Sequence, residues 1–305
     1  KVHEGRALVL PRFLYGNMLL SHVSHYHYGY GVSQGKLKKM IGPELTESGM
    51  MEAFHRLAEI FEKAMPKLIE EYRQSPVKHA DETSWRTDGE SGYGWIFCTP
   101  DTVIFRFANT RSSIIVDEVL GKAPLPGVLV VDRYGGYNQA PCPLQYCYAH
   151  LLRNIQDLKK EFPENGEISV FVDDFSKLLS LAMGLRKQPI TDIEYYTQAN
   201  DLKKQIIEIV EKPALHPGIR KFQDLFQEKA GRLYHWVSSR DIPAENNLAE
   251  RTARLLVIAR NISHGSQSQK GAKTRGIMMS IIHTASLRLG SIEASTQWMK
   301  ESLDY

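Results

Sequence analysis

The chain has 305 residues, of which 42% are hydrophobic and 24% charged, and its formal net charge is +3. This length and apolar content suffice for one large domain or for two to three small ones. No uncharged apolar run of about 18 residues occurs, which argues against a membrane protein, and the small net charge does not by itself indicate a nucleic-acid partner.

The cysteine content indicates a reducing compartment, because three cysteines are an odd and sparse set for a disulfide scaffold. We therefore expect a cytoplasmic protein. Cys142, Cys147 and His150 allow a zinc hypothesis, which is weakened by the missing fourth ligand. The alternative that we favour makes Cys147 a small apolar residue in a strand. Because the chain begins at Lys1 and has no leader, we expect a piece of a longer protein.

The N-terminal residues 1–45 predict an all-α, helix-turn-helix-like unit. A helix over 13–27 is followed by two glycines, and Ser33 then caps a second helix through residues 36–41. We predict that this unit binds DNA through three basic residues of its second helix, namely Lys36, Lys38 and Lys39. The alternative is that the aromatic and histidine residues of 26–30 only pack the turn.

Residues 46–76 predict a single long linking helix, because apolar residues recur at helical spacing from Thr46 to Arg73. The pattern then changes to short alternating segments over 79–87, 93–99 and 102–110, with turns at Asp88-Gly89 and Pro100-Asp101. These segments predict a three-stranded antiparallel meander.

A helix over 113–121, a buried strand over 127–132, a further strand over 144–149 and a helix over 150–162 complete the region 77–165. This order resembles a ribonuclease H-like α/β fold, a mixed sheet flanked by helices. We predict that 77–165 is the first part of a catalytic domain, that 166–240 is a helical insertion, and that 241–290 is the second part. A C-terminal helix or tail occupies 291–305, after a last helix that ends at Gly290.

Three acidic residues carry the expected chemistry. In the predicted fold Asp81 lies on the first strand, Asp132 lies at the end of the fourth, and Glu250 lies on a late helix. Carboxylates that a fold gathers require divalent cations to neutralise them, and oxygen ligands suit Mg²⁺ or Mn²⁺. Two ions would activate a nucleophile and stabilise a leaving 3′ oxygen, so we predict metal-assisted phosphoryl transfer.

Each acid also has an ordinary structural interpretation. An acid at a strand end often caps a helix or forms a turn, and Glu250 could form a surface ion pair worth less than about 1 kcal/mol. Glu245 competes with Glu250 as the third ligand, although an acid near a helix start is favoured by the helix dipole alone. Glu82 adjoins Asp81, but neighbouring residues of a strand point to opposite faces.

Positive charge is concentrated in two stretches that could neutralise DNA phosphates. Residues 1–42 carry six basic residues against Glu4, and residues 251–276 carry six against none. For either stretch alone, a solvated basic face is an equal alternative.

Four blocks, ADETSW, VVDRYGGY, CYAHLLRN and ENNLAERTAR, resemble the successive motifs of the insertion sequence 66 transposase family. The resemblance covers roughly residues 10–300 and implies a DDE transposase in which Asp81, Asp132 and Glu250 match the acidic triad. It implies DNA cleavage at terminal inverted repeats and joining to target DNA. Since both element ends must be joined, we expect a homodimer or larger assembly on DNA, in the bacterial nucleoid.

The same blocks supply further candidates for DNA contacts: Tyr134, His150, Arg153, Asn247, Arg251 and Arg254. Tyr137 and Asn246 also match these blocks, and any of the eight residues could position DNA or orient the carboxylates. Trp236 could stack on an unpaired base, although a core position is the favoured interpretation. Asn261 and Gln267 stand where relatives carry basic residues, which weakens the case for phosphate contacts there.

Two other functions remain open from the sequence. One is a catalytically silent, transposase-derived DNA-binding protein, which three intact acids argue against. The other is a metal-dependent nuclease of the same fold that cleaves nucleic acid without joining it.

Overall fold

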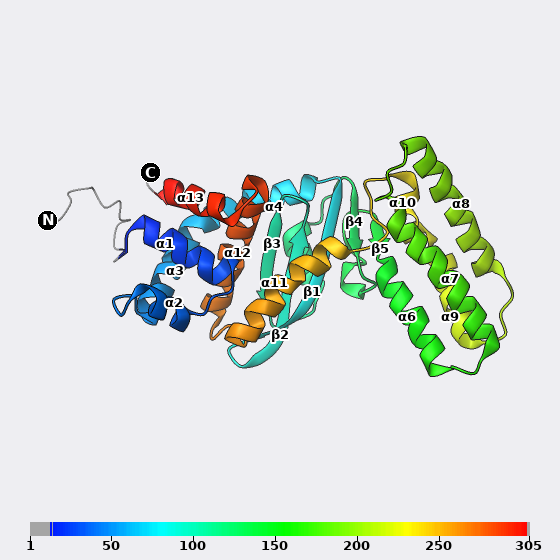
Figure 1. The fold of residues 1–305 in the computed structure, drawn as a ribbon, viewed down its shortest axis with the longest axis horizontal. Helices are drawn as coiled ribbons and strands as arrows, with labels where there is room; N and C mark the ends of the chain where they lie inside the picture. The colour runs from blue at the N-terminus through cyan, green and yellow to red at the C-terminus, as the bar shows by residue number, and fades with distance from the viewer. Residues whose placement is uncertain (1–12, 14, 304–305) are drawn as a thin grey trace. The chain divides into compact units, whose positions relative to one another are not determined.

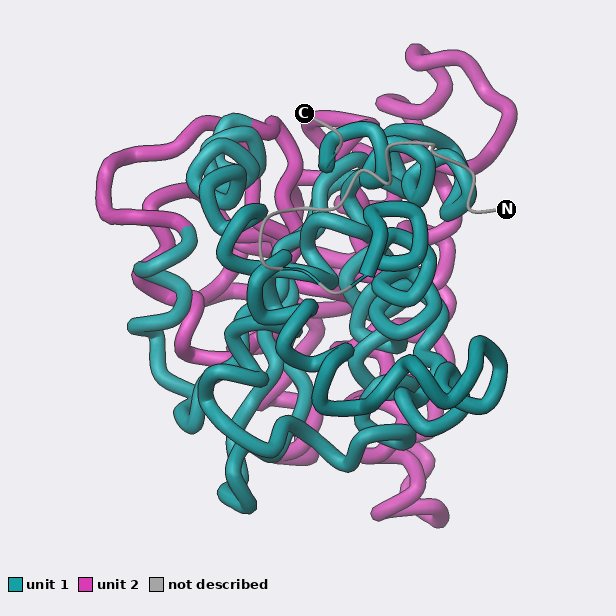
Figure 2. The backbone as a smooth tube through the Cα atoms, turned by 90° about the vertical axis from the view of Figure 1, so that its left-hand side faces the viewer, with its two compact units in different colours: residues 1–74, 81–119, 248–305 teal, residues 75–80, 120–247 magenta. Residues whose placement is uncertain are grey.

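The computed structural model describes residue 13 and residues 15–303. The chain divides into two compact units (Figure 2). The first unit comprises residues 1–74, 81–119 and 248–305, and the second comprises 75–80 and 120–247. None of the described helices is both long enough and apolar enough to cross a membrane. The domain boundaries expected from the sequence remain predictions.

One mixed sheet of five strands has the order β3-β2-β1-β4-β5 (Figure 1). Its strands are β1 Val77–Thr87, β2 Glu90–Cys98, β3 Val103–Ala108, β4 Val128–Val131 and β5 Leu144–Tyr146. β2 and β3 pair antiparallel, whereas β4 pairs in parallel with both β1 and β5. The predicted α/β class with a mixed sheet flanked by helices is confirmed.

The turn between β1 and β2 follows the sequence prediction. Asp88 and Gly89 both have positive φ angles, 54° and 79°. A two-residue turn with two positive φ angles matches the twist of an antiparallel hairpin, and Asp-Gly is one of its preferred sequences.

The edge strand β3 is covered by α12 (Gln269–Leu289). Ser280 Oγ accepts a hydrogen bond from Phe105 N at 2.8 Å, and Thr284 Oγ1 accepts one from Val103 N at 2.9 Å. Gly276 permits the approach, because a Cβ there would lie 3.0 Å from the Phe105 carbonyl oxygen. Side chains of α12 thus satisfy backbone donors that an exposed edge strand would leave open. As predicted, α12 ends at Gly290, in the left-handed conformation.

The prediction of one continuous helix from Thr46 to Arg73 is wrong. The structure has α3 (Glu47–Phe61), a 3₁₀ turn (Glu62–Ala64) and α4 (Met65–Gln74). Pro66 explains the break, because a proline inside a continuous helix lacks the N–H for the bond to residue 62 and its ring clashes with that carbonyl. At the other end the helix begins where we expected, with Thr46 Oγ1 accepting from Gly49 N at 3.1 Å.

The N-terminal helices of the first unit are α1 (Asn17–Ser24) and α2 (Gln34–Ile41), with a π-helix (His25–Gly29) following α1. Ser33 caps α2 as predicted, since its Oγ accepts from Lys36 N. His27 stacks on Phe54 with ring centroids 5.4 Å apart, and Tyr28 meets the same ring edge-on at 5.1 Å. These rings pack the turn. DNA binding by the helix-turn-helix-like unit stays a prediction, and part of that unit, residues 1–12 and 14, lies outside the described residues.

The remaining helices of the first unit pack on this framework. Arg73 Nε on α4 donates to the Val119 carbonyl at 2.7 Å, near the end of α5 (Ile114–Leu120). α11 (Asn247–Ser263) crosses β2 at Gly94, where a Cβ would lie 2.7 Å from Leu256 Cδ1. Asn17 Nδ2 on α1 donates to the Leu303 carbonyl of α13 (Ile292–Leu303) at 2.8 Å.

The second unit is mainly helical beyond its short strands. Its helices are α6 (Tyr148–Glu161), α7 (Gly166–Leu185), α8 (Asp192–Glu211), α9 (Pro217–Glu228) and α10 (His235–Ser238). All of 166–240 is described, and it contains helices and turns but no strand, as the sequence predicts. β5 is shorter than expected, because Cys147 already caps α6.

Trp236 is a core residue of the second unit. Only 1% of it is exposed, and its Nε1 donates to the Leu233 carbonyl at 3.0 Å and to Tyr148 Oη at 3.1 Å. Phe226 contacts the same cluster, with its ring centroid 6.2 Å from that of Tyr148. The favoured interpretation of Trp236 is confirmed, and no face of the indole is open to a base.

We expect Gly127→Ala to destabilise the second unit strongly. Gly127 has φ +72°, and a Cβ there would lie 2.1 Å from the Pro76 carbonyl oxygen, which accepts from Val128 N at the start of β4. Backbone strain alone costs about 1–3 kcal/mol, and the clash adds to it. Urea unfolding measures the loss. Gly184→Ala is the control, since no atom lies within 4 Å of its Cβ and it is helical; an equal loss in both variants would contradict the prediction.

Candidate active site

Asp81 and Asp132 occupy corresponding positions along two paired strands. β1 and β4 run parallel, with Val77 opposite Val128 and His79 opposite Val130. Asp81 follows His79 by two residues within β1, and Asp132 follows Val130 by two residues, directly after β4. The structure therefore confirms the strand positions expected for both aspartates.

Backbone N–H groups hold one oxygen of each of these carboxylates. Asp81 Oδ1 accepts from Glu82 N at 2.9 Å, and Asp132 Oδ1 accepts from Tyr134 N at 2.8 Å. Both side chains are partly buried. These bonds restrict side-chain rotation, so each carboxylate is oriented before any ligand arrives.

Asn246 joins three segments of the second unit. It is fully buried, its Nδ2 donates to the Ala80 carbonyl at 2.8 Å, and its Oδ1 lies 2.8 Å from His79 Nδ1. Its backbone N–H also donates to Cys147 Sγ at 3.1 Å. Ala80 precedes Asp81, and Glu250 follows Asn246 by one helical turn. Asn246 thus fixes the main chain from which two candidate carboxylates emerge, rather than touching the carboxylates themselves.

His79 was not identified from the sequence as a contact of Asn246. The sequence does carry a signal, since His79 is a polar residue in the buried first half of β1, two positions before Asp81. A buried polar side chain requires a partner, and Asn246 provides it.

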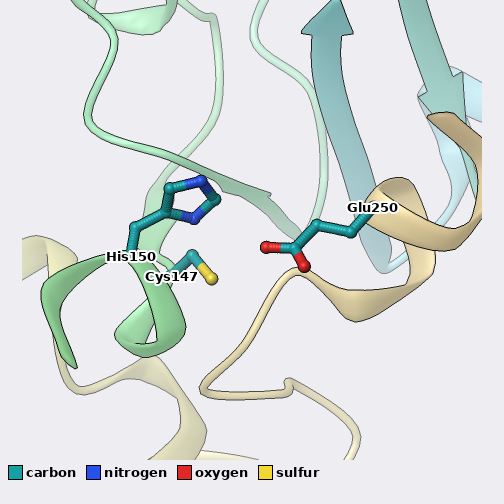
Figure 3. A group of neighbouring side chains, drawn as sticks. All are labelled: Cys147, His150 and Glu250. Carbon is teal, nitrogen blue, oxygen red and sulfur yellow. The ribbon is translucent and has the colours of Figure 1, made fainter. Parts of the chain in front are cut away.

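Glu250 and Glu245 differ in their surroundings. Glu250 lies in the first turn of α11 (Figure 3) and is partly exposed. Glu245 is 3% exposed, and its Oε1 lies 3.2 Å from Lys187 Nζ and 3.4 Å from Asn247 Nδ2. Its ion pair within the second unit supports a structural role for Glu245, which leaves Glu250 as the preferred third acid. Asn247, a candidate for DNA contact, already donates to Glu245.

Glu82 is also engaged elsewhere. Its side chain is only 2% exposed, and Arg111 Nε donates to its Oε1 at 2.9 Å. The Arg111 guanidinium also lies over the Tyr93 ring, 5.7 Å from its centroid. These contacts make Glu82 part of an ion pair of the first unit.

The zinc hypothesis loses one of its cysteines. The ligand atoms of Cys147 and His150, both near the start of α6, lie within 4.8 Å of each other (Figure 3). Among the described residues, no group of potential metal ligands that close together includes Cys142. Burial raises the pKa of the Cys142 thiol, which keeps it protonated at neutral pH. Cys147 is buried, as the alternative predicted, but it is the N-cap residue of α6 and does not lie in a strand.

The candidates for DNA contacts belong to both units. In the first unit Lys36, Lys38 and Lys39 on α2 are exposed, as are Arg251 and Arg254 on α11. In the second unit Arg153 is exposed, whereas Tyr134, His150 and Asn247 are partly buried. Tyr137 is buried and meets the Tyr134 ring edge-on. Exposure is compatible with phosphate contacts for the basic residues, and their role stays a prediction.

Arg260 has a structural use that the sequence did not reveal. Its Nη1 donates to the Ser84 carbonyl at 2.7 Å, which ties α11 to β1 within the first unit. One charge of the basic stretch 251–276 is therefore used inside the fold.

Comparison with known proteins defines the class. Residues 12–274 match the model of the family described as Transposase IS66 family, and this match covers most of the chain and all three candidate acids. The class is that of transposases, enzymes that cleave DNA and have DNA as their partner. The chain belongs to the IS66 transposase family. A search of curated proteins gave no match.

Proposed function

We propose that the chain is a DDE transposase that cleaves DNA at transposon ends and joins the freed 3′ hydroxyl to target DNA. One observation supports this most. His79 and Val130 are paired across the parallel strands, Asp81 lies two positions after His79, and Asp132 lies two positions after Val130. Two residues return a side chain to the same face of a strand, so parallel pairing favours two carboxylates at one place on one face. We further propose that the fold is ribonuclease H-like, which the strand order supports.

The donor chemistry fits a hard divalent cation. Asp81, Asp132 and Glu250 offer only carboxylate oxygens, the ligands that Mg²⁺ and Mn²⁺ prefer. In the described structure no hydrogen bond to Asp132 Oδ2 is present, so this oxygen is open to a ligand. We propose that these acids hold two ions, which would supply charge for activating the attacking hydroxyl and stabilising the leaving 3′ oxygen.

The remaining contribution of the chain is positioning. The backbone bonds to Asp81 and Asp132 orient these two acids, and Asn246 holds the segment before Asp81 through the Ala80 carbonyl. Such preorganisation lowers the barrier for an in-line displacement, in which the protein forms no covalent bond to DNA. Because two element ends must meet, we propose that at least two chains assemble on the DNA.

A strand-transfer assay tests this function and the third acid together. Labelled terminal-repeat DNA from the native locus is incubated with Mg²⁺ or Mn²⁺ and with the chain, its Glu250→Gln variant or its Glu245→Gln variant. We expect joined products from the chain and their loss with Glu250→Gln. We expect Glu245→Gln to retain joining, because that acid is paired with Lys187.

The other outcomes identify the alternatives. Cleaved but unjoined products would indicate a nuclease. Binding without any product, in either metal, would indicate a silent DNA-binding descendant. Loss of joining only with Glu245→Gln would show that Glu245, and not Glu250, is the third acid of the active site.

A further inference from the structure

A pocket of about 370 Å³ lies in the first unit where α2 and α12 begin. Ser33, Gln34 and Gly35 line it from α2, and Ser268 and Gly271 line it from α12. The first N–H groups of a helix have no partner within the helix and carry partial positive charge. Two helix starts that open into one pocket favour a negatively charged occupant.

Arg275 provides an independent indication of an anion. It lines the pocket although only 8% of it is exposed, and its guanidinium lies over the rings of Tyr28 and Trp85, at 5.6 and 5.4 Å. In the described part of the chain it makes no ion pair or hydrogen bond. A guanidinium has five donors, and no described acceptor of the chain uses them, so an anion that entered the pocket would find these donors available.

The other polar groups in the pocket are compatible with an anion. His27 lines the pocket, and burial, followed by the charge of Arg275, lowers its pKa to about 4. The His27 ring is therefore neutral at pH 7, and its Nδ1 lies 2.8 Å from the Val32 carbonyl oxygen. Glu47 is the one acid among the lining residues, and it is exposed.

The loop before α12 is held rigidly. Ser266 N donates to the Arg86 carbonyl at 2.8 Å, and Ser266 Oγ accepts from Trp85 Nε1 at 3.2 Å. Gly265 has φ +124°, and a Cβ there would lie 2.3 Å from the Arg86 carbonyl oxygen. This backbone fits only glycine, and the contacts preform the pocket wall that carries Ser268.

We propose that this pocket binds one phosphate group of the DNA backbone, with Arg275 as the central donor. A backbone phosphate offers acceptors to the guanidinium and carries the negative charge that both helix starts favour. The exposed Lys36, Lys38 and Lys39 continue along α2 from the pocket and would contact neighbouring phosphates of the same duplex. The inference rests on the proposed function only in taking DNA as the partner.

Two variants and one control test the pocket. Arg275→Met removes the charge and keeps an unbranched apolar stem. Gln34→Glu places an acid in the pocket at a helix start, where an acid favours the helix. Gln198→Glu makes the same exchange at an exposed position of α8, outside the pocket. First, thermal unfolding is compared in inorganic phosphate and in chloride at equal ionic strength. We expect phosphate to raise the unfolding temperature of the wild-type chain and of Gln198→Glu, and to raise that of Arg275→Met and Gln34→Glu by less.

Second, the affinity for a labelled duplex is measured by fluorescence anisotropy across a range of salt concentrations. We expect Arg275→Met to bind about tenfold more weakly and to reduce the slope of log affinity against log salt by about one. We expect Gln34→Glu to weaken binding as well. Because an acid at a helix start stabilises the helix, this variant is expected to fold and can test the pocket even if Arg275→Met unfolds.

The results separate the inference from the proposed function. Equal phosphate stabilisation and equal salt slopes in all four proteins would overturn the inference. Phosphate stabilisation that depends on Arg275, with unchanged DNA affinity, would indicate a free-phosphate site and overturn the assignment to the DNA backbone. DNA binding that depends on Arg275 in a chain that never cleaves DNA would support the inference and contradict the proposed catalysis.

Discussion

Asp132→Asn is expected to abolish Mg²⁺-dependent cleavage of terminal-repeat DNA while leaving DNA affinity nearly unchanged. The amide keeps the shape of the side chain, and its oxygen still accepts from Tyr134 N. It removes the negative charge that a cation requires. Metal stabilisation of transition-state charge is worth several kcal/mol, so we expect the cleavage rate to fall by roughly three orders of magnitude. Single-turnover cleavage kinetics, together with anisotropy binding, measure both quantities.

Asp157→Asn is the matched control for this experiment. Asp157 lies on α6, is exposed, and pairs with Lys160 at 2.8 Å, so its charge contributes little. We expect its cleavage rate to stay within about twofold of the wild-type rate. Full cleavage by Asp132→Asn would remove Asp132 from the active site, and equal losses in both variants would point to a general effect of charge.

Trp236→Ala is expected to lower the free energy of unfolding by about 3–5 kcal/mol, the usual cost of truncating a buried tryptophan. The indole is 1% exposed, and its removal also takes away the hydrogen bond that its Nε1 donates to Tyr148 Oη, whereas the Leu233 carbonyl still accepts from Tyr148 Oη. Urea unfolding, followed by circular dichroism because the indole itself is removed, measures the loss.

Trp236→Phe distinguishes packing from DNA stacking. It keeps an aromatic ring in the core, so we expect a smaller destabilisation and an unchanged affinity for single-stranded DNA. A loss of single-strand affinity in a stably folded Trp236→Phe protein would show that the indole reaches a base after all. Binding by the intact chain and by this variant is compared at one salt concentration, since affinity for DNA depends on salt.

The elements that the sequence predicts well are those with a local cause. Asp88-Gly89 specifies its own turn, the apolar run before Asp132 marks a buried strand, and Ser33 and Thr46 mark helix starts. The apolar spacing continues across residues 62–64, so it does not reveal the break in the helix there. Pro66 is the sequence signal that one helix cannot continue through this region.

The candidate site was predictable only in part, because some of its features arise from tertiary contacts. The strand positions of Asp81 and Asp132 follow from local patterns. The Asn246 contacts join residues 166 and 167 positions apart in the chain, and no spacing in the sequence reveals them. From the sequence, Arg275 is indistinguishable from the other charges of the basic stretch 251–276. Its burial depends on the rings of Tyr28 and Trp85, which are distant in the sequence.

The cover that α12 places over β3 has a consequence for assembly. Proteins with an open edge strand can recruit a second chain by extending the sheet, and the risk grows with local concentration. A transposase that gathers several copies on paired DNA ends raises that concentration itself. Because Ser280 and Thr284 already accept from the backbone N–H groups of Phe105 and Val103, these two groups are not available to a strand of another chain. If copies assemble on DNA as proposed, they can therefore associate through side-chain surfaces and separate again without joining into one continuous sheet there.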